Sequence, residues 1–446
     1  MRRGRPINAD VPATETPEAA AEPERKSPPP EEKSAPAAKK APPKPVETAP
    51  PQQGFPGALK LVGGLALLGI VFLVVAIIGG SGGDGDDETA DAPAPVPAAE
   101  PTELGYPAFA TGNTTRVGGA DPAANAAGVA LAAFPSVTPA QRPAAVTLVS
   151  EDDWAGGIAG SVLMAAPVRA PVLISAADGA PDATEEALGA LQPSGAKNTN
   201  GATAFAIGDV AAPSGKVTKV AAGSPAVEAA AIARLRERLA GSPPDHFVLA
   251  PEASPELAMP AAAWAARSGD PVLFSAVEKL PKATATALKR HPGVPVYVLG
   301  PSSAISSGVV REVAAIAKQV KRVSGEDPIA NAIAFARYDD EDFGWSINDP
   351  GHGFVLTRTD APLNAAAATP LSASGTWGPL LLTDDAGTLP TDLRSYFLDV
   401  KPGYTNNPTR AFYNHVWVIG DQEAIDVNQQ AEVNELAELT RIGSAP

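Results

Sequence analysis

The feature that most constrains the fold is a set of landmarks that occurs three times along the chain. A basic residue followed by valine opens each occurrence, at Arg116, Lys219 and Arg322, and these positions are separated by equal steps of 103 residues. A proline and an alanine-containing segment of helical length follow each time. Because self-similarity at a fixed period is the signature of repeated structural units, the sequence predicts three homologous modules of about 100 residues each.

Each repeat also contains two apolar runs of the kind that form buried strands. The first run begins at a proline, which favours extended backbone in the residue before it. The second run ends in glycine, which permits a sharp exit into a loop. Short β-rich runs that alternate with helical segments predict βαβ units and a parallel sheet buried on both faces. The first runs are residues 171–174, 271–274 and 379–382, and the second runs are 206–208, 298–300 and 418–420.

Two of the repeats carry an explicit signal for the start of a helix. Asp121-Pro122 and Asp327-Pro328 stand at equivalent positions. An aspartate oxygen can accept hydrogen bonds from the unpaired N–H groups of the first turn, and proline is tolerated there because it needs no partner. We therefore predict that helices begin at Pro122 and Pro328.

The chain before the first repeat has a different composition. Residues 1–57 are rich in Pro, Ala, Glu and Lys with almost no large apolar side chain, which predicts a disordered tail. Residues 61–83 carry no charge, and this run reaches the roughly 20 residues that cross a bilayer. We therefore predict a transmembrane helix at 58–80, followed by a flexible linker at 81–109 that is rich in Gly, Asp, Ala and Pro.

Charge predicts the orientation and excludes some partners. Lysine and arginine cluster before the apolar run, and the first basic residue after it is Arg116. The positive-inside rule therefore predicts a single-pass membrane protein with a cytoplasmic N-terminus and its repeats on the outer, cell-wall side. The absence of cysteine excludes disulfides, thiolate nucleophiles and cysteine zinc sites. The net charge of −16 argues against nucleic acid as a partner.

The repeats resemble the cell-wall-binding repeat that occurs as tandem triplets in surface proteins of Gram-positive bacteria. Each repeat of that family opens with a basic residue, an apolar residue, a glycine and Asp-Arg-Tyr, with Thr-Ala shortly after. It continues with a Pro-Val/Ile-Leu-Leu strand and a strand that ends in Val-Gly-Gly. The matching residues here are Arg116, Gly119, Asp121 and Ala126 in the first repeat, Lys219 and Ala229 in the second, and Arg322, Gly325, Asp327 and Ala332 in the third.

The chain departs from the family pattern at two polar positions. Pro122-Ala123 and Pro328-Ile329 replace Arg-Tyr, and in the second repeat Ser224 replaces the aspartate. The position of the family threonine is held by Asn125, Glu228 and Asn331.

The resemblance implies three Rossmann- or flavodoxin-like modules around a pseudo-threefold axis, which would anchor the protein to an anionic wall polymer. The predicted fold class is therefore α/β, with three tandem modules and parallel sheets, preceded by a disordered tail and one transmembrane helix. The predicted repeats span residues 110–215, 216–318 and 319–446, within a monomer.

The candidate ligand contacts follow from the same positions. Helix N-termini favour anions, so a basic residue beside one makes a plausible anion site. The alternative is that the arginines bridge neighbouring modules through carboxylates such as Asp121 and Asp327. The candidate contacts are Arg116, Asn125, Arg322 and Asn331.

Three other groups of polar residues have a functional and a structural interpretation. The cluster Arg234, Arg236 and Arg238 is either a local basic site or a solvated helix face. The acidic run 339–342 could hold a cation, because hard ions favour carboxylates, or could be a solvated loop. The four histidines are scattered, and for His246 and His415, which stand directly before predicted strands, we expect a structural role.

No catalytic or cofactor fingerprint emerges from the repeats. A Gly-x-Ser-x-Gly elbow, a Walker loop and a Gly-x-Gly-x-x-Gly motif are all missing outside the linker, so we expect no enzyme, no metal and no cofactor. The leading hypothesis is a membrane-anchored, non-enzymatic envelope protein whose repeats bind cell wall polymer or a wall-associated partner. One alternative is a protein-binding scaffold whose repeats have lost polymer binding, and another is an envelope enzyme with a site at the module ends.

Overall fold

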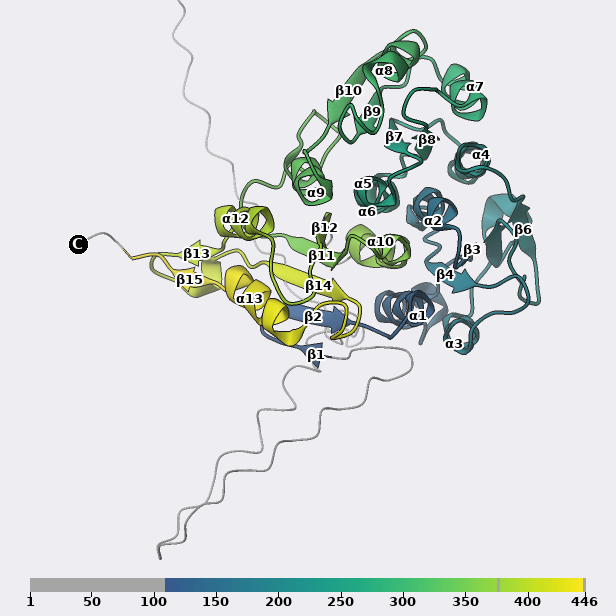
Figure 1. Ribbon diagram of the computed structural model, residues 1–446. Helices are drawn as coiled ribbons and strands as arrows, with labels where there is room; N and C mark the ends of the chain where they lie inside the picture. Colours follow the sequence, from purple (N-terminus) through teal and green to yellow (C-terminus); the bar gives the residue numbers. More distant parts are fainter. Residues whose placement is uncertain (1–108, 375–377, 444–446) are drawn as a thin grey trace, which may run out of the picture. The chain divides into compact units, whose positions relative to one another are not determined.

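Three parallel sheets form the framework of the computed structural model, which describes residues 109–374 and 378–443. The first module contains the sheet β4-β3-β5-β6, the second the sheet β10-β9-β7-β8, and the third the sheet β1-β2-β14-β11-β12 (Figure 1). The strands of these sheets are β1 (Phe109–Ala110), β2 (Thr114–Val117), β3 (Val146–Ser150), β4 (Val172–Ser175), β5 (Ala204–Ile207), β6 (Val217–Val220), β7 (Phe247–Pro251), β8 (Val272–Ser275), β9 (Val296–Leu299), β10 (Val320–Val323), β11 (Gly353–Arg358), β12 (Leu380–Thr383) and β14 (His415–Ile419).

Every pairing in these sheets is parallel except that of β1 with β2. The inner strands β3, β7 and β11 are rich in apolar residues and buried on both faces, as helices on both sides of a parallel sheet require. A small additional pair joins β13 (Gly403–Tyr404) to β15 (Thr440–Arg441) in the third module.

Helices connect the strands and cover the sheets. The α-helices are α1 (Pro122–Ala133), α2 (Trp154–Gly160), α3 (Asp182–Leu191), α4 (Pro225–Ala240), α5 (Pro255–Ala258), α6 (Pro260–Ser268), α7 (Lys282–Arg290), α8 (Ser307–Ala314), α9 (Pro328–Arg337), α10 (Pro362–Ala367), α11 (Thr369–Ala373), α12 (Thr391–Asp399) and α13 (Val427–Ala437). Short 3-10 helices are η1 (Pro139–Gln141), η2 (Ser161–Met164), η3 (Lys197–Thr199) and η4 (Pro408–Arg410).

The predicted helix starts are confirmed. Asp121 Oδ1 accepts a 2.8 Å hydrogen bond from the Ala124 N–H, and Asp327 Oδ1 accepts one of 2.8 Å from the Ala330 N–H. Each aspartate is an N-cap with proline directly after it. Local sequence therefore suffices to begin α1 and α9 where they begin.

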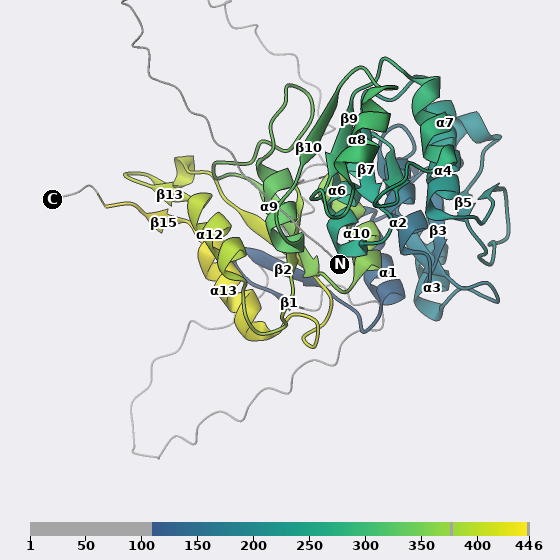
Figure 2. The same cartoon turned by 45° about the horizontal axis from the view of Figure 1, so that its top comes forward.

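The sheets are offset from the sequence repeats by one strand. The basic residue that opens a repeat lies on a strand that pairs with the sheet of the preceding repeat: β6 with β5, and β10 with β9. For the first repeat, β2 pairs with β14 of the third module. In Figures 1 and 2, α13 lies against β2 on this sheet. The first and last parts of the described chain thus share one sheet.

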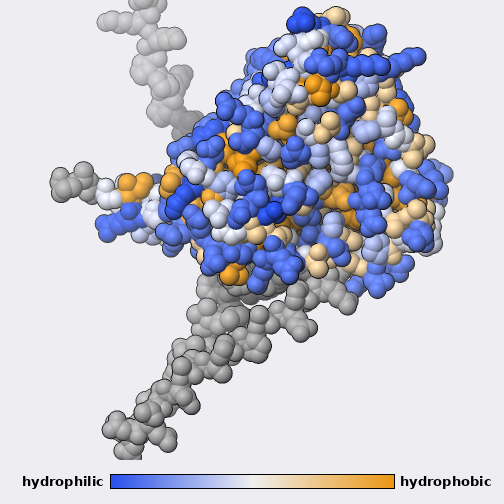
Figure 3. Space-filling view, viewed as in Figure 1, coloured by the Kyte–Doolittle hydropathy of each residue, from blue (hydrophilic) through white to orange (hydrophobic). Residues whose placement is uncertain are grey.

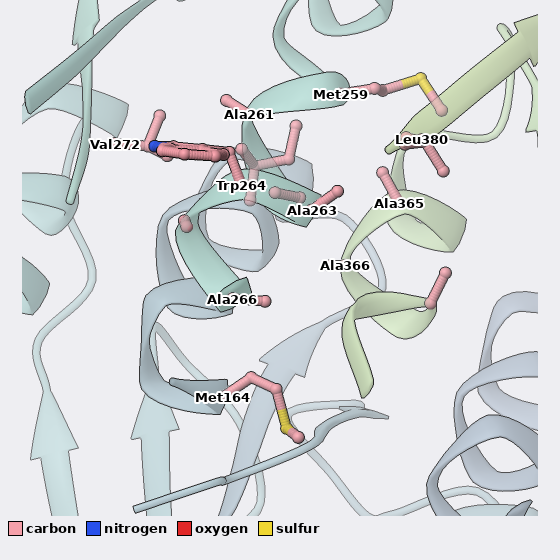
Figure 4. Packing of buried hydrophobic residues seen from close by; sticks show 14 of the residues in the cluster. Met164, Met259, Ala261, Ala263, Trp264, Ala266, Val272, Ala365, Ala366 and Leu380 are labelled. Atoms are coloured by element: carbon pink, nitrogen blue, oxygen red, sulfur yellow. The ribbon is translucent and has the colours of Figure 1, made fainter. Parts of the chain in front are cut away.

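The modules meet through alanine-rich helices. Figure 4 shows Met164 from η2, Trp264 from α6 and Ala366 from α10 in one cluster of buried residues, to which all three modules contribute. Small side chains let these helices pack closely, and removing their apolar surface from water is the main stabilising term. On the face shown in Figure 3, polar residues predominate and apolar ones are scattered, as on most soluble surfaces.

The predicted fold class needs one correction. None of the helices in residues 109–374 and 378–443 is long and apolar enough to cross a membrane. The longest of these segments, α4, has 16 residues and carries several charges, whereas a membrane span needs roughly 20 apolar residues. The predicted tail, the predicted helix at 58–80 and the linker up to residue 108 lie outside the described residues. Within the described residues the structure supports the parallel α/β modules and shows no transmembrane helix.

Candidate functional site

The three basic residues that open the repeats occupy equivalent places in the three sheets. Each is the third residue of a four-residue strand. Their register partners on the neighbouring strand are also equivalent: Val418 for Arg116, Ala206 for Lys219 and Val298 for Arg322. The step of 103 residues is therefore a true structural repeat.

Arg116 is fully engaged inside the protein. Its side chain is 1 % exposed, and Nη1 donates to the carbonyl oxygens of Gly420 at 2.8 Å and Asp421 at 2.6 Å. Nη2 donates to the Ile425 carbonyl at 2.6 Å, and Nε to Gln430 Oε1 at 3.0 Å. Burial lowers the pKa of Arg116 to about 10, against the opposing charges of nearby aspartates. The guanidinium thus fastens β2 to the loop after β14.

Arg322 makes the corresponding contacts one module earlier. Its Nη1 donates to the Gly300 carbonyl at 2.5 Å and its Nη2 to the Ile305 carbonyl at 2.7 Å. The intervals from Gly300 to Ile305 and from Gly420 to Ile425 are the same, so one arginine-binding loop occurs twice. Lys219, the third member of the set, is exposed.

A second set of equivalent residues lies on the helix that follows. Asn125 on α1, Glu228 on α4 and Asn331 on α9 each accept a hydrogen bond from a glycine N–H just before the helix. The two asparagines also reach into another module, because Asn125 Nδ2 donates to Asn364 Oδ1 at 3.1 Å and Asn331 Nδ2 donates to the Leu257 carbonyl at 3.2 Å. These side chains therefore join helix starts across module interfaces.

Glu228 faces a carboxylate instead of an amide or a carbonyl. Its Oε1 accepts from the Gly223 N–H at 2.8 Å, and its carboxyl group lies beside that of Asp153, the N-cap of α2 in the first module. Burial, followed by the negative charge of Asp153, raises the pKa of Glu228 to about 7. Glu228 is 4 % exposed.

The predicted ligand contacts thus fall at two separate interfaces, with Arg116 and Asn125 at one and Arg322 and Asn331 at the other. The structure shows these side chains bonded within the protein, and their role toward a ligand stays a prediction. The alternative bridge through Asp121 and Asp327 is wrong in its partners, because both carboxylates cap helices. The bridging acceptors are main-chain carbonyls of the third repeat for Arg116 and of the second repeat for Arg322.

Two solved structures share this fold. The cell wall proteins Cwp6 and Cwp8 from Clostridium difficile match with TM-scores of 0.56 and 0.54, each at 18 % identity over 73 % of this chain. The match covers 48 % of the Cwp6 chain and 52 % of the Cwp8 chain, so this chain spans about half the length of either protein. No protein-family model matches the sequence, and no curated protein matches it.

A basic pocket of about 430 Å³ lies at the end of α4 in the second module. Arg234, Arg238 and Arg290 line it together with Glu237, which holds Arg290 through a 2.9 Å ion pair. Arg234 and Arg238 are exposed and have no ion-pair partner within the described residues. The predicted cluster is therefore divided, because the half-buried Arg236 lies toward Asp270 and Asp245.

A second pocket, of about 360 Å³, lies at the amino ends of β7 and β8. His246 Nδ1 is 3.2 Å from Asp270 Oδ2, which also accepts from Trp264 Nε1 at 2.9 Å. On its other side, His246 Nε2 is 3.2 Å from Asp342 Oδ1, which belongs to the loop between α9 and β11. A histidine between two carboxylates favours the imidazolium form.

The loop that carries Asp342 is the acidic run of the third repeat, and it is bonded to the second module. Asp340 Oδ2 accepts from Tyr297 Oη at 2.7 Å and from Lys321 Nζ at 2.5 Å. Phe343 is buried and stacks on Tyr297, with ring centroids 3.5 Å apart. Within the described residues no group of three or more acidic, histidine or cysteine side chains could hold a metal ion.

Sequence reasoning missed two of these clusters for different reasons. The Glu228–Asp153 pair was visible as a departure from asparagine at one of three equivalent positions, but its partner lies 75 residues away. The His246 cluster draws on residues of two repeats. The sequence shows only that a polar residue stands shortly before each of two strands, His246 before β7 and Asp270 before β8. It carries no information about Asp342.

Proposed function

We propose that this protein is a non-enzymatic component of the bacterial envelope that associates with the cell wall, where its modules bind a wall polymer or a wall-associated partner. The observation that carries the proposal is the shared fold: 73 % of the chain superposes on two cell wall proteins. At 18 % identity, a common ligand does not follow from the fold. The binding surface must therefore be identified from this chain's own residues.

The basic pocket of α4 is the surface best suited to an anionic polymer. Guanidinium groups bind phosphate and carboxylate oxygens through paired N–H donors, and Arg234 and Arg238 retain those donors within the described residues. Glu237 neutralises Arg290 in part, so two net positive charges remain in the pocket. A pocket of about 430 Å³ falls within the range of small-ligand pockets.

The acidic character of the whole chain limits how such binding would work. A net charge of −16 repels a polyanion at long range. At physiological ionic strength the Debye length is about 8 Å, so a local pair of arginines still attracts an anionic group that comes into contact. We therefore expect binding that is weak per site and sensitive to salt.

Co-sedimentation of the purified protein with isolated Gram-positive walls tests the proposal. Walls are compared before and after extraction of their anionic polymers. Sedimentation that falls at least about tenfold after extraction supports polymer binding, and sedimentation that persists supports a wall-associated protein or the glycan as partner. No sedimentation with either preparation would overturn wall association.

Charge reversal then tests the surface. The double variant Arg234→Glu/Arg238→Glu should lower polymer-dependent sedimentation about tenfold or more, because two attractive contacts become repulsive. Arg311→Glu/Lys318→Glu reverses two exposed basic residues on and just after α8 and so changes the net charge by the same amount; it is the matched control and should sediment like the wild type. Equal loss in the two variants would show that net charge matters and the pocket does not.

A further inference from the structure

The three equivalent positions Asn125, Glu228 and Asn331 each perform two tasks. The side-chain oxygen accepts a glycine N–H that precedes the helix, at 2.8 Å for Asn125 and for Glu228. The other end of the group must then bond to the neighbouring module. An asparagine amide does both, because it has an acceptor oxygen and donor N–H groups.

An ionised glutamate can perform only the first task. A carboxylate accepts hydrogen bonds and donates none, and its neighbour across the interface, Asp153, is also an acceptor. Asp153 Oδ1 already accepts from the Gly156 N–H at 2.8 Å, and its buried Oδ2 receives no N–H or O–H donor from the described residues. A protonated Glu228 supplies that donor and then reproduces the amide's pattern of one acceptor and one donor.

The surroundings leave room for both carboxyl groups and give no counter-charge. Gly208 ends β5 beside them with a positive φ, and a β-carbon there would stand 3.5 Å from Asp153 Oδ2 and 3.8 Å from the Glu228 carboxyl. The other charged groups on the elements that contact α4 are Lys197 on η3, Lys219 on β6 and Lys282, Lys289 and Arg290 on α7, and Glu151, Asp152 and Asp209 lie on the loops beside α2 and β5. Among the described residues, only Asp153 acts on Glu228 by its charge.

We propose that Glu228 and Asp153 form a proton-dependent latch between the first and second modules. The latch is closed when the two carboxyl groups share one proton and open when both are ionised. At the two other interfaces the equivalent contacts are made by Asn125 and Asn331, which do not titrate, so the proton sensitivity is confined to one joint of the three. The latch does not depend on which ligand the surface of the protein binds.

The sign of the effect follows from linkage. The folded-state pKa of Glu228 is raised above that of a glutamate in the unfolded chain, about 4.3. Its contribution to stability is therefore fully present below that unfolded pKa, and it is lost as the pH rises through the folded pKa near 7.

A tryptophan at the contact between the first and second modules can report on the opening of the latch. Trp154, the residue after Asp153, begins α2 and packs edge-on against Phe274 of β8 in the second module, with ring centroids 5.6 Å apart. Opening of the latch should expose Trp154 to water and shift its fluorescence to longer wavelength. Subtracting the spectrum of Trp154→Phe isolates this signal from the other four tryptophans.

The test compares the melting temperature of three proteins between pH of about 5 and about 9. Glu228→Gln replaces the titrating acid by an amide, as in the other two modules, and Glu186→Gln, at an exposed glutamate of α3, is the control. Relative to Glu228→Gln, the wild type should lose about 3–8 °C as the pH rises through 7, and Glu186→Gln should follow the wild type. The Trp154 signal should titrate over the same range. A constant difference between wild type and Glu228→Gln across the range would overturn the latch.

Asp153→Asn keeps the test decisive if Glu228→Gln fails to fold. The asparagine oxygen can still accept from the Gly156 N–H, and its Nδ2 can donate to an ionised Glu228. This variant should therefore also lose the pH-dependent drop. If Asp153→Asn retains the wild-type slope, the shared proton is not the cause and the proposal fails.

Discussion

Arg116 on β2 and Gly420 at the end of β14 are 304 residues apart in the chain and are joined by a 2.8 Å hydrogen bond from the guanidinium to the carbonyl oxygen. The pairing of β2 with β14 runs beside it. Loop closure over such a distance costs entropy before the contacts form, so this sheet is expected to complete late in folding. The arginine makes the pairing of β2 with β14 specific, because its four hydrogen bonds fix one register of the two strands.

The first prediction is that Arg116→Ala lowers the free energy of unfolding by about 3–5 kcal/mol. Truncation leaves the buried carbonyls of Gly420, Asp421 and Ile425 without this donor, and each unsatisfied polar group costs about 1–3 kcal/mol. Urea denaturation measures the change. Lys219→Ala, at the equivalent exposed position, is the control and should stay within about 0.5 kcal/mol of the wild type.

The same pair of variants tests the predicted ligand role of Arg116. If the arginine acts only by closing the sheet, the folded fraction of Arg116→Ala should bind walls as the wild type does. Wall binding that falls with unchanged unfolding free energy would instead identify Arg116 as a ligand contact.

The second prediction concerns Gly118, which follows β2. A β-carbon there would lie 2.3 Å from the Gly420 carbonyl oxygen, a main-chain atom that cannot move without shifting β14. Gly118→Ala should therefore lower the free energy of unfolding by about 1–3 kcal/mol, because the added methyl group overpacks the contact between β2 and β14. Gly112→Ala, where a β-carbon meets nothing within 4 Å, should be nearly neutral. Equal thermal stability of the two variants would contradict the close approach.

The strands and helix starts of the modules could be predicted because their signals are local. Pro171 and Pro271 precede strands at Val172 and Val272, and Asp121 caps its own helix through a residue three positions away. Each of these depends on neighbours within one turn or one strand.

The pairing of β2 could not be predicted in the same way. Its four residues read as the beginning of the first repeat, whereas its partner β14 belongs to the last. Nothing in a period of 103 residues says whether a strand joins its own repeat or the previous one. Packing between modules decides which sheet β2 joins. The contact between Glu228 and Asp153 also lies between modules, so it could not be predicted either.

The third prediction is that Phe343 holds the acidic loop of the third repeat on the second module. Phe343→Ala should lower the free energy of unfolding by about 3–5 kcal/mol, because the ring is fully buried and stacked on Tyr297. The loop around it should also become accessible to limited proteolysis. Phe412→Ala, which removes a phenylalanine that is 69 % exposed, is the matched control and should change neither property.

The last prediction concerns the protonation of His246. Burial lowers the pKa of His246, but the hydrogen bond that the ring donates to Asp270 and the negative charges of Asp270 and Asp342 outweigh burial, so the pKa is raised above its ordinary value. A raised histidine pKa contributes stability that is fully present below the unfolded pKa, about 6.5, and is lost as the pH rises through the folded value.

Asp342→Asn should lower the His246 pKa, because it removes one of the two carboxylates and leaves Asp270 in place. The chain has four histidines, so an NMR titration of histidine-labelled protein resolves them, and His246→Gln assigns the signal. Asp349→Asn, beside the half-buried His352, should leave the His246 pKa unchanged. An unchanged His246 pKa in Asp342→Asn would show that the loop exerts no charge on the pocket. Because both His246 and Glu228 contribute stability that is lost as the pH rises, the melting temperature of Asp342→Asn is also compared in the Glu228→Gln background, where Glu228 no longer contributes to the pH dependence.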